Sequence, residues 1–331
     1  MVNLYRFGKG TVANFYGVKK VTLFRNADSP LAAIMCIDDV PEGVTFKEPE
    51  AIVKSHSVSS ANDQANYVIG YQPGELDLPL HYVKSGRWWN YILGSVTTPT
   101  GTTSHTISEA TTLYYPQFHA EMEHSTTAEC VRRELIGNYM KSYHFEDSQN
   151  EACKHSLRFG VSKGISANNI NRPTSFDARG LYPAGSYSHT VLYNSSSCGI
   201  EVLSSSWDLE YEWALTKGGD KYVTAVYMMR RNFKVKFHVR MYKKTLLQIP
   251  DDPNSYAGAI TWKGKWSKSA TDYLQISVNN LALVNKPFIK RIGDEEYFWE
   301  GDLEFKRTGT SAGTITMKVK DENSGDKYES S

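Results

Sequence analysis

The chain has 331 residues, with 37 lysines and arginines against 36 aspartates and glutamates, and a formal net charge of +1. This length suits one large core or two ordinary domains, and the balanced charge favours neither a nucleic-acid binder nor a highly acidic solvating protein. Its 21 tyrosines, 13 phenylalanines and 7 tryptophans are residues that favour strands. The composition therefore predicts a mainly β fold.

Signals for a membrane or an oxidising compartment are weak in the sequence. Residues 1–10 hold no apolar core of signal-peptide length, and nowhere do about twenty apolar residues run together. The four cysteines are widely spaced, with no Cys-x-x-Cys pair, at Cys36, Cys130, Cys153 and Cys198. We expect a soluble protein with no membrane segment and with reduced, mostly buried thiols.

The first elements in chain order are short strands. Apolar runs at 21–24 and 32–37 predict two of them, and a strand, a polar turn and the entry to the next motif are expected between residues 51 and 69. The stretch from 74 to 82 then alternates leucines with polar residues, which is typical of a half-buried strand. Its apolar positions are Leu76, Leu78 and Leu80, and its polar positions include Glu75 and Asp77.

A short helix and a long hairpin follow. Trp88, Tyr91 and Ile92 recur at helical spacing before Gly94, which predicts a helix of one or two turns. Residues 95–106 are rich in threonine and predict an exposed loop. Alternating stretches predict one strand near 118–123 and a hairpin of two strands, at 134–145 and 152–161.

The second half offers a similar order of parts. A strand is expected at 188–193, and the clearest alternation of the chain lies at 200–216. A strand with a basic face follows at 232–242, and residues 243–249 predict a short helix that Pro250 ends. Further strands are expected at 259–266, 272–284, 296–307 and 314–319.

This repeated order predicts duplication of a small β-rich domain. We expect a mainly β, β-rich α+β protein with two tandem β-sandwich or barrel domains, each with a short flanking helix. The first covers residues 1–165 with the Thr-rich loop, and the second covers 166–331 with a frayed C-terminal tail. The alternative is a single large β-sandwich, in which any series of strands looks repetitive.

Residues able to bind a metal or to catalyse a reaction are present but poorly arranged. Four histidines and two cysteines, His119, His124, Cys130, His144, Cys153 and His155, have no metal-ligand spacing. No Gly-x-Ser-x-Gly elbow is present, and carboxylates that alternate along strands are more typical of a solvated face than of a glycosidase cleft. We expect no catalytic residue, no metal and no cofactor, and note that a wet strand face could equally line an aqueous pore.

Three segments resemble the tail tube proteins of long-tailed viruses of bacteria and archaea. They are the run 70–80, the aromatic helix ending at Gly94 and the strand 134–139 that leads into a polar tip, and the likeness in pattern and order spans about Val44 to Val319. In that family, β-sandwiches with a small flanking helix assemble into rings. The inner strands join into a barrel that conducts DNA, and the rings stack into a tube.

The resemblance implies a structural virion protein of the tail, assembled in the host cytoplasm, and not an enzyme. A duplicated chain would form homotrimeric rings of pseudo-sixfold symmetry, and homohexameric rings are the alternative. Other implied partners are the tape measure, terminator and baseplate or tip proteins, with DNA passing only transiently. No membrane partner is expected.

A tube must let a polyanion slide, so its inner face should lack the density of lysine and arginine that binds phosphates. On this hypothesis the lumen-facing candidates are Glu121, Glu123, Asp208, Glu210 and Glu212. The basic face of Lys234, Lys236 and Arg240 would then lie between subunits or outside. Ring-stacking candidates are the tail and, in the Thr-rich loop, Thr97, Thr98, Thr100, Thr102 and Thr103.

Two functions of other classes remain open at this point. A carbohydrate-binding β-sandwich or adhesin module would explain exposed tryptophans, for which the candidates are Trp88, Trp89, Trp262 and Trp266. A hydrolase that uses paired carboxylates is the enzyme alternative, and no motif supports it.

Overall fold

The fold is described from a computed structural model. The described residues are 13–14, 18–24, 45–47, 49–57, 64–80, 87–97, 104–111, 113, 118–124, 130–148, 153–166, 187–217, 222–241, 260–267, 270, 273–285, 289–291, 297–307 and 315–320. Strands dominate this part of the chain, and its one helix is α1 (Arg87–Leu93). The expectation of a mainly β fold is confirmed.

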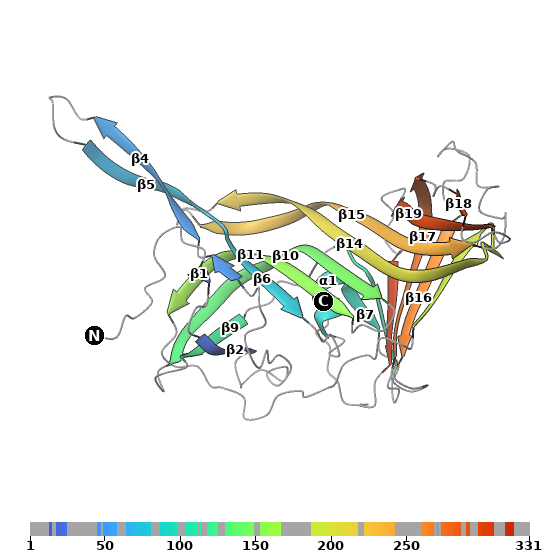
Figure 1. The fold of residues 1–331 in the computed structure, drawn as a ribbon. Helices are drawn as coiled ribbons and strands as arrows, with labels where there is room; N and C mark the ends of the chain where they lie inside the picture. Colours follow the sequence, from blue (N-terminus) through green and yellow to red (C-terminus); the bar gives the residue numbers. More distant parts are fainter. Residues whose placement is uncertain are drawn as a thin grey trace.

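Eighteen strands form one antiparallel sheet that folds over itself into two layers (Figure 1). The long layer runs in the order β1 (Ala13–Asn14), β3 (Thr45–Lys47), β6 (Gly74–Leu80), β11 (Lys154–Ser166), β10 (Cys130–Ser148), β14 (Ile200–Lys217), β15 (Val223–Met241), β19 (Tyr297–Arg307) and β18 (Ile289–Arg291). One end of β10 also carries β9 (Phe118–His124) and then β2 (Val18–Phe24).

The second layer runs across the long strands in Figure 1. Its order is β7 (Gly94–Thr97), β8 (Ser104–Glu109), β20 (Ile315–Lys320), β17 (Tyr273–Asn285), β16 (Ile260–Ser267), β12 (Tyr187–Tyr193) and β13 (Ser196–Ser197). The strand β17 belongs to both layers, because residues 273–278 pair with β20 and residues 281–285 pair with β19. Asn280 lies between these two segments with a φ of 58°, a conformation that asparagine tolerates better than most residues.

Aromatic side chains fill the space between the layers. Trp207 of β14 and Phe237 of β15 contact Trp262 of β16, with ring centroids 6.4 and 5.3 Å apart. Phe145 of β10 meets Trp266 edge-on at 4.7 Å. All five side chains are almost completely buried, and large apolar side chains each stabilise a fold by about 1.5–3 kcal/mol when buried. This shared core holds the sheet in its sandwich-like form.

The helix α1 packs against the same core. Trp89, Tyr91 and Ile92 are buried, and the hydroxyl of Tyr211 in β14 donates a hydrogen bond to the carbonyl of Ile92. Gly94 follows with a φ of 101°, the left-handed conformation in which glycine commonly ends a helix. The short helix expected here is confirmed, whereas the second one, at 243–249, lies outside the described residues.

Strands from both halves of the chain pair with one another, so the two-domain arrangement is not confirmed. In the long layer β10 pairs with β14, and in the second layer β8 pairs with β20. No boundary near residue 165 separates the described sheet into two parts, and β11 continues to Ser166. This pairing is what the alternative, a single large sandwich, expects.

The expected Thr-rich loop is wrong at both of its ends. Residues 94–97 and 104–109 are the strands β7 and β8, which pair from Gly94 opposite Glu109 to Thr97 opposite Thr106. In β8 half-buried and buried positions alternate, but two of the buried ones are the polar residues His105 and Glu109. Their polarity hides the alternation from a reading based on hydrophobicity.

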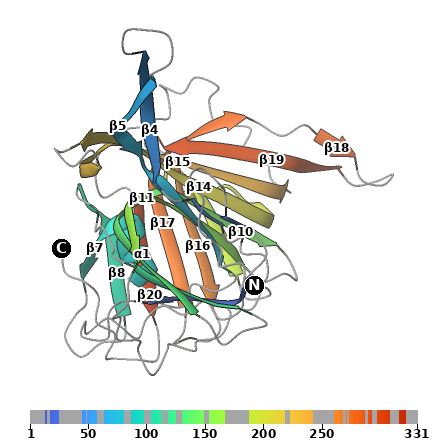
Figure 2. The ribbon, with the colours of Figure 1, turned by 90° about the vertical axis from the view of Figure 1, so that its left-hand side faces the viewer.

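A two-stranded arm leaves the body of the molecule. It consists of β4 (Glu50–Ser57) and β5 (Gln64–Gln72), which form a separate antiparallel sheet. Figures 1 and 2 both show this hairpin projecting away from the layers. The strand expected after residue 51 is confirmed by β4, and the expected polar turn lies mostly outside the described residues.

A buried carboxylate ties the two layers together. Asp147 of β10 accepts hydrogen bonds from the Ser205 amide at 2.8 Å, the Trp266 indole at 2.6 Å and the His189 ring at 3.1 Å. Burial alone would raise the pKa of Asp147. The hydrogen bond and the charge of His189, together with the hydrogen bonds from Ser205 and Trp266, outweigh burial and lower this pKa. The carboxylate therefore links β10 and β14 to β12 and β16.

Replacing Asp147 with alanine removes the acceptor that these donors share, so we expect the free energy of unfolding to fall by about 3–5 kcal/mol in urea denaturation. The exposed Asp302 is the matched control, and Asp302→Ala should cost about 1 kcal/mol or less. Because the pKa of Asp147 is lowered on folding, its stabilisation is present above about pH 3.9 and is lost as the pH falls through the folded value. Equal losses in the two variants would contradict this role.

Candidate functional site

The outward side of the long layer carries a broad band of charged residues, which we call the charged face. Its basic members are Lys141, Lys154, Arg158, Arg230, Lys234, Lys236, Arg240 and Lys306, and its acidic members are Glu75, Asp77, Glu146, Asp208, Glu210, Glu212, Glu300, Asp302 and Glu304. His144 and His238 lie among them. Residues directly opposite in antiparallel strands project to the same side, so register alone places this band on one face.

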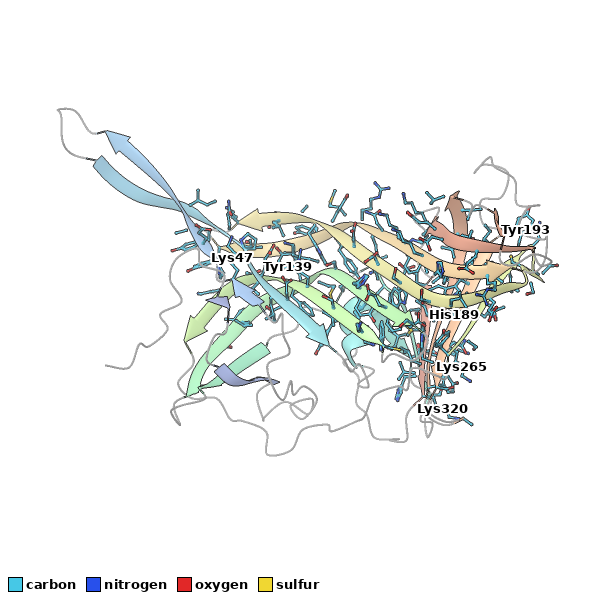
Figure 3. All side chains as sticks on the ribbon, in the orientation of Figure 1. Lys47, Tyr139, His189, Tyr193, Lys265 and Lys320 are labelled. Atoms are coloured by element: carbon cyan, nitrogen blue, oxygen red, sulfur yellow. The ribbon has the colours of Figure 1, made fainter. Side chains whose placement is uncertain are left out.

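Period-two alternation produces this face. In β14 the buried Trp207, Leu209 and Tyr211 point into the core, which leaves Asp208, Glu210 and Glu212 on the other side. The strand β15 behaves in the same way over residues 233–239, where buried apolar and more exposed polar positions alternate. Figure 3 shows side chains along both sides of these strands, with the labelled Tyr139 of the long layer well apart from His189 of the second layer.

Pairs of oppositely charged side chains connect strands across the charged face. The Arg158 guanidinium donates to Asp77 at 2.7 Å, and Lys141 pairs with Glu75. Further along, His238 contacts Asp302 at 2.8 Å, and Arg240 contacts Glu300 at 3.3 Å. These pairs are partly or largely exposed, so each contributes at most about 1 kcal/mol to stability.

A histidine stands between two of the acidic residues. His144 contacts Asp208 through Nδ1 at 2.6 Å and Glu146 through Nε2 at 3.0 Å. The hydrogen bond with Asp208, followed by that with Glu146, raises the pKa of His144 to about 9 against the opposing effect of burial. At neutral pH this ring is therefore charged and offsets part of the acidic charge of β14.

The proposed lumen residues have different positions. Asp208 is half-buried and Glu210 and Glu212 are exposed, all three on the charged face. Glu121 and Glu123 belong to β9, which pairs with residues 130–135 of β10 on the edge that β14 occupies farther along. The side chains of these two glutamates lie outside the described part of the chain.

The acidic and basic strand faces share one side of the sheet, so their expected separation is wrong. Lys234 lies directly opposite Asp208 across the β14–β15 pair, and both are on the charged face. Lys236 and Arg240 follow at intervals of two and four residues on the same side. The sequence suggested separate faces because β14 carries mainly acidic and β15 mainly basic side chains. The pairing of β14 with β15 places both sets on the same side of the sheet.

Of the stacking candidates, Thr97 is the exposed last residue of β7. The other threonines, Thr98, Thr100, Thr102 and Thr103, lie outside the described residues. The tail from 321 to 331 lies outside them as well.

The described histidines of the crowded region do not form one cluster. His155 is buried and its Nδ1 lies 2.5 Å from the Tyr143 hydroxyl, whereas His144 is on the charged face. Among the described residues, no group of three or more His, Cys, Asp or Glu side chains could hold a metal ion. Cys153 and Cys198 are free and buried, and burial raises the pKa of their thiols to about 12 and about 11.

Three of the four tryptophans that suggested carbohydrate binding are core residues. Trp89, Trp262 and Trp266 are no more than 1% exposed, and Trp88 has no described side chain. Large exposed apolar side chains occur instead at Leu215, Tyr227, Met229 and Val284. The first three lie near the end where β14 finishes and β15 begins. A shift of register between Glu212 and Trp213 disguises the alternation there.

Comparison of the sequence with known protein families and with curated proteins finds no match. No described helix is long and apolar enough to cross a membrane.

We expect an NMR titration of the His144 ring to give a pKa near 9, and Asp208→Asn to lower it toward 6.5 because the strongest partner is lost. Glu212→Gln, an exposed change on the same strand face, is the control and should leave the pKa unchanged. Because folding raises the pKa, stabilisation from His144 is complete below about pH 6.5 and is lost as the pH rises through about 9. An unchanged pKa in Asp208→Asn would contradict the pairing.

Proposed function

We propose that this chain is a structural protein whose copies assemble into rings that stack into a viral tail tube, with the charged face lining the channel for DNA. The observation that carries the proposal is the form of the long layer. Its long paired strands have an aromatic core on one side and a continuous wet face on the other. A sheet of this form can contribute one segment to a larger barrel while its sandwich remains intact.

The charge pattern of this face supports passage of DNA without tight binding. The carboxylates of the charged face slightly outnumber its lysines and arginines, and several basic groups are already paired within the sheet. Affinity for DNA depends on basic groups that neutralise phosphates, and neighbouring carboxylates oppose that interaction. In this revised form of the hypothesis, the lumen is balanced in charge and not purely acidic.

The ends and edges of the long layer offer surfaces for neighbouring copies. On the edge of β15 away from β14, the strand β19 covers only residues 234–241. Among the described strands, none pairs with residues 227–233 on that edge. The hairpin end beside this edge exposes Tyr227 by 60% and Met229 by 69%. Exposed apolar side chains next to an open strand edge are typical of an association surface.

The projecting β4–β5 arm supplies a second surface for contact. Its two strands pair with each other and, among the described strands, with no others, so the arm extends well beyond the layers (Figure 2). It can reach a neighbour in the same ring or in the next one. Other tail proteins would meet the tube at its two ends.

One continuous sandwich in each chain supports the homohexameric alternative over a trimer of pseudo-sixfold symmetry. The trimer depends on two equivalent ring segments in one chain, and strands of both halves instead share the same layers. A sixfold ring would then need six copies.

Electron microscopy of the negatively stained, purified protein tests this proposal directly. We expect rings or tubes, whereas monomers that persist at high concentration would contradict assembly.

The double variant Tyr227→Lys/Met229→Lys should remain folded and lose assembly, because two charges replace the exposed apolar side chains at the hairpin end. Val284→Lys changes a residue of comparable exposure, 47%, in β17 and is the control that should still assemble. Sedimentation velocity measures the shift from large assemblies to monomers. Assembly of the double variant at the wild-type level would show that this surface is not an interface.

A further inference from the structure

A cavity of about 460 Å³ opens where β19 ends beside the exposed edge of β15. Its walls come from β15, from Glu210 of β14, from the end of β19 and from residues 109–111 at and just after the end of β8. Five basic side chains line it, namely Arg230, Arg231, Lys234, Lys306 and Arg307. Only two carboxylates, Glu109 and Glu210, stand against them, so the lining is strongly cationic.

The inner wall is a buried cluster of three charges. Glu109 accepts hydrogen bonds through Oε1 from Arg231, at 2.9 Å, and from Arg307, while its Oε2 accepts from the amide of Ile315 at 3.1 Å. The three charged side chains are only 3–7% exposed. Burial alone would raise the pKa of Glu109, but the charges of Arg307 and Arg231 outweigh it and lower that pKa. One ionised carboxylate thus accepts hydrogen bonds from two guanidiniums.

One donor in this cluster has no acceptor. Arg231 uses Nη1 for Glu109 and Nη2 for the carbonyl of Ala110 at 3.1 Å, whereas its buried Nε has no hydrogen-bond partner. Its guanidinium also lies over the ring of Tyr211, 5.3 Å from the centroid. A buried cationic donor without an acceptor is costly, because the lost hydration is not replaced.

The outer part of the cavity also holds basic side chains close to one another. Lys234 and Lys306 lie directly opposite each other across the β15–β19 pair, and like charges in this position destabilise a sheet. Glu304 offers only a distant partner to Lys306, at 3.8 Å, and Arg230 is exposed nearby. An anion placed between the lysines would relieve this repulsion.

We propose that this cavity is a binding site for a phosphate group, with Arg231 as the inner ligand and Lys234 and Lys306 at the mouth. A tetrahedral oxyanion offers several acceptors at once, which suits the Nε donor of Arg231 and two ammonium groups. The cavity is of the size usual for small-ligand sites, so both free phosphate and a small phosphomonoester fit. The site does not depend on the tube proposal, since one chain supplies every residue.

Isothermal titration calorimetry on the full chain tests the site, with inorganic phosphate and ribose 5-phosphate as the two probes and with chloride adjusted to hold ionic strength constant. Wild type should bind in a saturable, one-to-one manner. Lys234→Met/Lys306→Met should bind at least about tenfold more weakly, because two charged contacts are lost. Lys236→Met/Lys263→Met removes two exposed lysines that do not line the cavity and should retain wild-type affinity.

The two probes distinguish the sources of the phosphate group. Tighter binding of ribose 5-phosphate assigns the site to a phosphomonoester, and equal or weaker binding assigns it to free phosphate. Absence of saturable binding of either probe to wild type would overturn the proposal, as would an equal loss in both lysine pairs. Arg231→Lys keeps the charge but removes the Nε donor, so it should bind phosphate more weakly than wild type. Circular dichroism checks that this variant is folded. Parallel electron microscopy separates this result from the tube proposal, because binding by protein that forms no rings leaves the site standing.

Discussion

The alternation of the long strands, held in register between a few local shifts, is the constraint on which the rest of the structure depends. Residues of β14 and β15 pair from Ile200 opposite Met241 to Lys217 opposite Val223. A slip of one residue would turn Trp207 and Phe237 toward solvent and bury Asp208 and Lys236 in their place. The cost of burying those charges fixes the register, and the register in turn creates both the aromatic core and the charged face.

Two buried carboxylates complete what the aromatic core begins. Asp147 joins β10 to the second layer through His189 and Trp266, and Glu109 joins β8 to β15 and β19 through Arg231 and Arg307. Hydrogen bonds of this kind have direction, so they determine where one layer sits on the other, whereas apolar packing alone tolerates several arrangements. The cluster at Glu109 differs in facing a cavity that five basic side chains and only two carboxylates line, and for this reason it can serve a ligand as well as the fold.

Period-two patterns predicted most of the described strands, because a half-buried strand must alternate. The pattern failed where polar groups are buried, as at His105 and Glu109 of β8, and where a register shift interrupts it, as between residues 223 and 231 of β15. Pairing between distant strands leaves no local signal, so the sequence could not show that strands of both halves pair, as β10 does with β14. The same limit hid the cluster at Glu109, whose partners Arg231 and Arg307 lie 122 and 198 residues away.

The central functional claim is that the charged face lines a closed channel in the assembled state. Glu210→Cys, on that face, and Thr190→Cys, at an exposed position of β12 in the other layer, allow a direct comparison by reaction with a maleimide linked to a bulky polyethylene glycol. Unmodified wild type gives the background from its native cysteines. The account predicts that assembly protects Glu210→Cys from the bulky reagent while Thr190→Cys stays reactive. Equal reactivity of Glu210→Cys before and after assembly would contradict it.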